Sequence, residues 1–129
     1  IDYITIGSTG NAQDFGDLSG TRGSIMACSS ATRGVAQGGG SGTNVVEFIT
    51  IATTSNVTDF GDLTVARYAG AGTSSSTRGI CYGGYDAPDN NNVIDYITIA
   101  STGNSTDFGD CVGERTDLGG TSAAHGGLQ

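Results

Sequence analysis

The sequence predicts an all-β fold built from a repeated unit, and two observations support this prediction. A stretch of 22 residues occurs three times, at 1–22, 46–67 and 94–115, and ten of its positions are identical in all copies. A fixed period of this length indicates a repeat architecture, in which each unit buries its apolar face against its neighbours. Gly, Ser and Thr are also abundant, whereas Lys and Trp are absent. Such a composition disfavours solvated helices and is typical of short strands joined by tight turns.

Each period is expected to contain about four strands. The first alternates branched apolar and aromatic residues on both of its faces, at 1–8, 46–53 and 93–101. A short strand around the motif Asp-Phe-Gly-Asp follows it. An inner strand of small residues comes next, at 23–30 and 68–75, and a last strand ends in Gly-Gly, at 32–39 and 77–84. Four strands per period match one blade of a β-propeller.

The order of these landmarks resembles the kelch repeat. A strand ending at Gly83 and Gly84 is followed by a variable loop, a strand with Tyr96, the aromatic anchor Phe108 and then Arg115. Typical kelch repeats carry Trp where this chain has Phe, so the resemblance is to a divergent, kelch-like branch. The amino-acid sequence of the repeat is similar to that of repeats in virion structural and tail proteins of viruses that infect marine cyanobacteria. The resemblance implies a β-propeller in a phage particle.

The chain is expected to form one repeat domain, 1–129, with units at 1–45, 46–93 and 94–129. It starts with the two outer strands of one blade and stops within the inner strands of another, where His125 replaces an Arg of the other units. Three blades are fewer than the about 4–8 of a closed propeller. Another copy, or further parts of a longer protein, is therefore expected to complete the ring, with residues 119–128 pairing near residues 1–6 of the neighbour.

Eight repeated side chains are expected to have structural roles. Three Phe residues are predicted to be buried between blades, and the five Arg residues all occupy repeat positions. An Arg ring could grip an anionic ligand, but pairing with the Asp residues of the Asp-Phe-Gly-Asp segments is the favoured interpretation. The positions are Phe15, Phe60, Phe108, Arg22, Arg67, Arg115, Arg33 and Arg78.

One polar cluster is not repeated and is the candidate ligand site. It lies in the loop 86–92, which is three residues longer than its counterpart in the preceding unit. Oxygen-rich loops of this kind can hold calcium or bind a sugar, although Asp, Asn and Pro are also ordinary turn residues. The candidate residues are Asp86, Asp89, Asn90, Asn91 and Asn92.

The net charge, the apolar runs and the cysteines indicate which partners and cofactors to expect. The net charge is −8, which disfavours binding to nucleic acid or to anionic lipid. No run approaches the about 20 apolar residues of a membrane helix, so membrane insertion is not expected. Cys28, Cys81 and Cys111 occupy unrelated repeat positions and lack Cys-x-x-Cys spacing, so free, buried thiols are predicted. No metal or other cofactor is expected.

The function predicted from the sequence is non-enzymatic. A carboxylate pair that recurs in every unit indicates scaffolding rather than a catalytic site. The expected role is a tail, fibre or surface-decoration module of a phage particle, with other copies of itself, other virion proteins and a host surface glycan as partners. The alternative is an oligomeric carbohydrate-binding lectin assembled as a propeller, which would be secreted rather than part of a virion.

Overall fold

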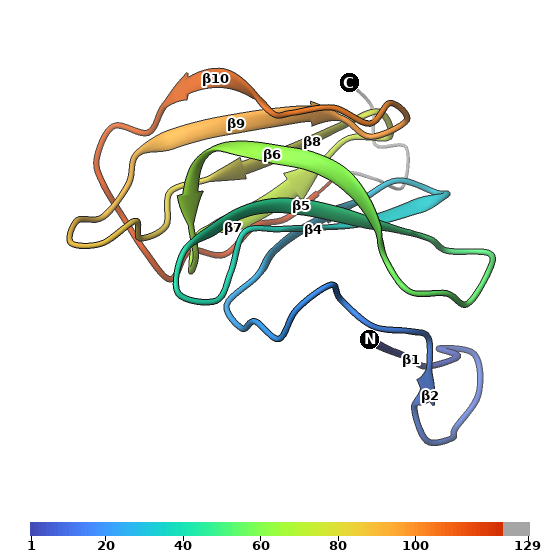
Figure 1. The fold of residues 1–129 in the computed structure, drawn as a ribbon. Coiled ribbons are helices and arrows are strands. Elements are labelled where there is room, and N and C mark those ends of the chain that lie inside the picture. The colour runs from blue at the N-terminus through green and yellow to red at the C-terminus, as the bar shows by residue number, and fades with distance from the viewer. Residues whose placement is uncertain (123–129) are drawn as a thin grey trace.

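The protein is described by a computed structural model that covers residues 1–122. Within this range the chain forms strands and no helix, and the strands make three antiparallel sheets (Figure 1). The prediction of an all-β fold is therefore confirmed. The described residues include no helix that is long and apolar enough to cross a membrane.

Two of the sheets are four-stranded meanders in which every strand pairs with the next one along the chain. Sheet I contains β3 (Met26–Ser29), β4 (Arg33–Gln37), β5 (Thr43–Thr50) and β6 (Thr58–Arg67). Sheet II contains β7 (Ala71–Ser74), β8 (Arg78–Tyr82), β9 (Val93–Thr98) and β10 (Thr106–Asp110). The first two periods each contain four strands, as predicted, and each of these sheets combines the last two strands of one period with the first two of the next.

The third sheet, here named the N-terminal hairpin, contains only β1 (Asp2–Tyr3) and β2 (Gln13–Asp14). The sequence predicts a strand over the whole of 1–8, and this prediction is wrong in its length. In sheets I and II the equivalent strands β5 and β9 pair on both edges, whereas β1 pairs on one edge within residues 1–122. Strand formation depends on cross-strand neighbours, so a strand with one short partner stays short.

Glycines make the turn from β4 to β5 and from β8 to β9. Gly38 and Gly83 both have a φ of 62°, a conformation that side chains on Cβ disfavour. Their amide groups donate to Val45 and Val93, which closes the two turns in the same way. The Gly-Gly motif therefore stands where the strand ends, as the sequence predicts, and it also makes the turn that follows.

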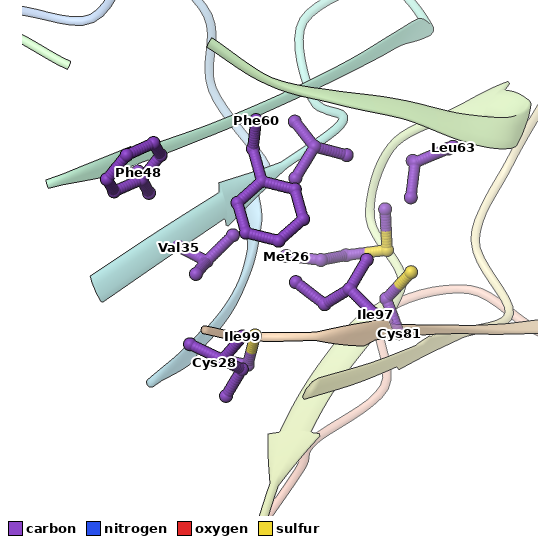
Figure 2. Close-up of a cluster of buried hydrophobic side chains, with 10 residues drawn as sticks. Met26, Cys28, Val35, Phe48, Phe60, Leu63, Cys81, Ile97 and Ile99 are labelled. Atoms are coloured by element: carbon purple, nitrogen blue, oxygen red, sulfur yellow. The ribbon is translucent and has the colours of Figure 1, made fainter. Parts of the chain in front are cut away.

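Sheets I and II pack face to face, and their interface is the apolar core. β3 lies against β7 and β8, and β6 lies against β9 and β10. Figure 2 shows Met26, Phe60 and Leu63 from sheet I meeting Cys81 and Ile97 from sheet II. The rings of Phe60 and Phe48 pack edge to face with centroids 5.9 Å apart, an arrangement that aromatic pairs favour.

The predicted burial of the three repeated Phe residues holds for two of them. Phe15 and Phe60 are buried, with Phe60 only 2% exposed. Phe108 is 53% exposed, so its predicted burial is wrong within the described structure. Its ring packs against Tyr96, as Phe60 packs against Phe48, but no further sheet within residues 1–122 covers β10.

Residues 116–122 begin beside the start of β7 in sheet II, as β7 begins beside the start of β3 in sheet I. The amide of Asp117 donates to the carbonyl of Ala69 at 2.7 Å, and the amide of Ala69 donates to the carbonyl of Ser24 at 3.0 Å. All three residues have positive φ, from 51° to 56°. The segment therefore begins as the inner strands β3 and β7 begin. His125, and most of the segment predicted to pair with residues 1–6, lie outside the described residues.

Candidate functional site

Two buried ion pairs join one repeat unit to the next, and they are the most distinctive polar feature of the described residues. Nη1 of Arg67, at the end of β6, lies 2.9 Å from Oδ2 of Asp95 in β9, and both side chains are fully buried. Arg22 forms the equivalent pair with Glu47 in β5, also buried. Ionised groups can be removed from water only when they are paired, so each Arg charge is committed to its carboxylate partner.

These pairs support a structural role for the Arg residues but correct the predicted partner. The sequence predicts that Arg67 contacts the Asp-Phe-Gly-Asp segments, whereas its partner is Asp95 in the preceding motif Ile-Asp-Tyr. The first Asp of the segments caps its own turn instead, because Asp14 and Asp107 accept from the amides of Gly16 and Gly109. Arg67 also donates to the Cys81 carbonyl at 3.4 Å.

A reciprocal pair of hydrogen bonds forms a second link between consecutive units. The amide of Asp17 donates to Oδ1 of Asn56 at 2.9 Å, and the amide of Val57 donates back to the Asp17 carbonyl at 3.0 Å. The next unit repeats the link, since the amide of Asp62 donates to Oδ1 of Asn104 at 3.1 Å. We name this arrangement the Asn link.

The Asn link is not among the features predicted from the sequence. The signal is present, because Asn11, Asn56 and Asn104 are identical in all three copies. The acids opposite the Arg residues are missed for a different reason. Asp2, Glu47 and Asp95 share a repeat position but not an identity, so a search for identical positions does not find them.

The other Arg residues stack on aromatic rings or lie apart from any acid. The guanidinium of Arg33 lies 4.2 Å from the centroid of the Phe48 ring and donates to the Ile99 carbonyl at 2.8 Å. Arg78 lies over Tyr96 at 4.5 Å. Arg115 forms no ion pair within residues 1–122.

The loop 86–92 uses part of its polar surface to hold its own shape. Nδ2 of Asn91 donates to Oδ2 of Asp86 at 2.9 Å, and Oδ1 of Asn91 accepts from the amide of Val93 at 2.7 Å. Asn91 is buried, Asn92 is half-buried, and Asp89 and Asn90 are exposed. The structure therefore joins Asp86 to Asn91, and leaves Asp89 and Asn90 as the open part of the predicted ligand site.

A metal site is not formed within the described part of the chain. No group of three or more His, Cys, Asp or Glu side chains in residues 1–122 is placed to hold a metal ion. In the loop 86–92 only Asp86 and Asp89 carry charge, and one of the two is already bonded to Asn91.

The three cysteines are free thiols, as predicted. Cys28 and Cys81 are buried, and Cys111 is half-buried, so the predicted burial holds fully for two of them. Burial raises the pKa of the Cys28 thiol to about 12, with a smaller contribution from Cys81. Burial also raises the pKa of Cys81 to about 12, against the opposing effect of Arg67. Both thiols stay protonated near neutral pH and act as small apolar fillers.

An apolar groove of about 350 Å³ lies between the N-terminal hairpin and sheet I. Ile1 and Leu18 line it on one side, and Ile25, Val35 and Ile49 line it on the other. The corresponding face of sheet II is covered by β3, since Ile97 and Ile99 are almost fully buried there. In the groove, therefore, the face of sheet I is not covered by a strand of another sheet, whereas the corresponding face of sheet II is covered by β3.

No protein-family model matches this sequence, and no curated protein matches it significantly. The geometry of the residues themselves therefore carries the assignment of function. Their chemistry is that of a repeat interface, in which ion pairs and Asn links join one unit to the next.

Proposed function

We propose that this chain is a non-enzymatic structural and interaction module of a phage particle, built from kelch-like propeller blades. One observation carries the proposal: the repeated polar side chains join consecutive repeat units. The pairs Arg22–Glu47 and Arg67–Asp95 and the two Asn links all bridge one unit to the next. Polar side chains that are bonded to the next unit stabilise the stacking of the units, and they are not available for catalysis.

The arrangement of the sheets supports the assignment to propeller blades. Sheets I and II have the same order of strands, and they stack with β3 beside β7 and β6 beside β10. Such stacking of like-ordered four-stranded meanders is how propeller blades lie around an axis. Further blades would complete the ring.

The place in a virion rests on the resemblance of the repeat to tail and structural proteins of marine cyanobacterial viruses. In this setting the exposed residues Asp89 and Asn90 are the side chains that we expect to contact a host surface glycan. Other virion proteins and other copies of the chain are the remaining partners. The acidic surface, with a net charge of −8, supports protein and sugar partners over nucleic acid.

The proposal is tested on particles of a phage whose genome encodes this sequence. Antibodies raised against residues 1–129 are expected to label the tail, fibres or surface of purified particles in immunogold electron microscopy. Presence of the protein only in the supernatant of infected cells would contradict a virion role. The location of the protein separates the virion module from the alternative lectin, because both would bind a sugar but only the virion module would be part of the purified particles.

A further inference from the structure

The buried ion pairs form a series that the described chain leaves incomplete. Arg22 pairs with Glu47 and Arg67 pairs with Asp95, always from one unit to the next. At the corresponding repeat positions stand a third Arg, Arg115, and a third acid, Asp2. Neither forms an ion pair within residues 1–122. The two groups lie at opposite ends of the repeat series, and each has the charge that the other end needs.

The Asn links form a second series with the same two open ends. Asp17 bonds to Asn56 and Asp62 bonds to Asn104, which leaves Asp110 and Asn11 as the next members. Neither takes part in an Asn link among the described residues.

The glycine contacts repeat this pattern. A Cβ on Gly61 would lie 2.5 Å from the carbonyl carbon of Gly103, so only a glycine permits the two sheets to approach so closely. The equivalent Gly109 faces open space, and so does Gly10, which occupies the repeat position of Gly103. The end of sheet II at β10 is therefore shaped for a unit that the described residues do not place there.

Apolar side chains are exposed on the same two ends. Phe108 is 53% exposed, whereas its equivalent Phe60 is 2% exposed. Ile6 is 95% exposed, whereas its equivalent Ile99 is 1% exposed. Each of these side chains is exposed where its equivalent is covered by a neighbouring unit, so both ends lack such a cover.

We propose that a second copy of this chain docks head to tail on the first. Arg115 and Asp110 of one copy bind Asp2 and Asn11 of the other, as Arg67 binds Asp95 and Asp62 binds Asn104 inside each copy. Residues 116–122 of the first copy enter the apolar groove of the second, where they supply the inner strand that its N-terminal hairpin lacks. The inference rests on the proposed function, because it names the partner of that module.

The two ends select a second copy because they match each other in charge, hydrogen bonding and apolar surface. The segment 116–122 begins with the same backbone turn as β3 and β7, so it can lie against sheet I of a neighbour as β3 lies against sheet II. A head-to-tail contact closes into a ring when its rotation permits. Two copies engaged at both ends would contain four complete sheets and two shared ones, a total of about six, within the usual range of about 4–8 propeller blades.

The test uses charge reversal, measured by light scattering on the chain of residues 1–129 with circular dichroism as the check on folding. The wild-type chain is expected at twice its 12.9 kDa mass. Arg115→Asp and Asp2→Arg should each raise the dissociation constant at least about 100-fold, because each leaves two like charges facing one another. The combined variant Asp2→Arg/Arg115→Asp should restore the dimer. Asp89→Arg makes the same charge change as Asp2→Arg but in an exposed loop, so it is the matched control for that variant and should leave the mass unchanged.

Several results would overturn the inference. They are a wild-type chain that stays at 12.9 kDa at all concentrations, single variants that associate like the wild type, and a folded combined variant that stays a monomer. A monomer would leave the virion proposal standing if the particles are labelled by the antibody. A dimer with unlabelled particles would sustain the head-to-tail contact and remove the proposed function.

Discussion

At the scale of single residues, Arg67 shows how a buried charge is held. Its partner Asp95 also accepts from the hydroxyl of Thr64 at 2.6 Å and from the Thr64 amide at 3.3 Å. The carboxylate is thus bonded to both a cation and neutral donors, which offsets its loss of hydration. Nε of Arg67 is buried without a hydrogen-bond partner, so the guanidinium is not fully satisfied.

Removing the Arg67 side chain should destabilise the protein strongly. Arg67→Ala leaves Asp95 charged and buried without its cation, and the expected loss in the free energy of unfolding is about 3–5 kcal/mol. Arg78→Ala is the control, because Arg78 only stacks on Tyr96 and should contribute less than about 1 kcal/mol. Denaturation in urea measures both. Equal midpoints for the two variants would show that the buried pair has no special weight.

The two buried thiols should make the fold sensitive to high pH. Their pKa values are raised from 9.0 to about 12 in the folded protein, so between these values the unfolded chain loses protons that the folded chain keeps. Stability should therefore be unaffected by these groups below pH 9 and fall as the pH rises from about 9 toward about 12. Cys28→Ala/Cys81→Ala should lower stability at neutral pH but flatten this decline, as measured by urea denaturation across the range. An equal slope in both proteins would contradict the assignment.

The role of a residue was predictable where the same amino acid recurs in every copy of the repeat. It was less predictable where only the chemical type of the side chain recurs. The structural role of Arg67 followed from its recurrence, but its partner Asp95 did not, because Glu occupies that position in the second unit. The burial of Phe60 followed from its recurrence, whereas that of Phe108 failed within residues 1–122. Recurrence gives a side chain the same local position in each unit, but burial depends on whether a neighbouring unit is present.

At the scale of strands, the approach of one sheet to the next is set by backbone rather than by side chains. Gly61 lies in β6 with a φ of 145°, and its α-carbon faces the peptide between Gly103 and Asn104. This close approach brings the Asp62 amide within hydrogen-bonding reach of the Asn104 side chain, at 3.1 Å. The glycine and the asparagine therefore act together to hold two units at a short distance, which explains why both are identical in every copy.

Substituting Gly61 should separate the sheets. In Gly61→Ala the added methyl would lie 2.5 Å from the Gly103 carbonyl group, and overpacking of this kind costs about 1–3 kcal/mol beyond the strain of the positive φ. Gly103→Ala is the matched control, since its φ is also positive, at 155°, but a methyl there meets nothing within 4 Å. Thermal unfolding should show a much larger loss for Gly61→Ala. Losses of equal size would mean that backbone strain, not the contact, dominates.

The elements themselves were largely predictable, because alternation, small-residue runs and Gly-Gly turns are local signals. The strand expected at 1–8 contracted to Asp2–Tyr3, although its sequence is close to that of β5 and β9. What differs is the missing neighbour on its second edge, and no local pattern reports that.

At the scale of the whole molecule, the two ends of the stack lack the neighbouring unit that its middle has. A net charge of −8 sits on a chain of 129 residues. Two copies that approach one another therefore repel at long range, whereas the proposed pair of Arg115 and Asp2 would attract at contact. The balance between these two effects depends on salt.

Association of two copies should strengthen as salt is added from about 10 mM to about 150 mM. The Debye length falls from about 30 Å to about 8 Å over this range, which screens the repulsion between whole copies. The docked pair of Arg115 and Asp2 should be as buried as Arg67 and Asp95, whose side chains are 0% exposed, and buried pairs are screened much less. Sedimentation velocity at several salt concentrations should give a dissociation constant that falls several-fold. Asp89→Arg, which reduces the net negative charge from −8 to −6 (−8 + 2), should show a shallower dependence of the dissociation constant on salt. An association that weakens steadily with salt would instead indicate exposed ion pairs, and would contradict a contact that repeats those inside the stack.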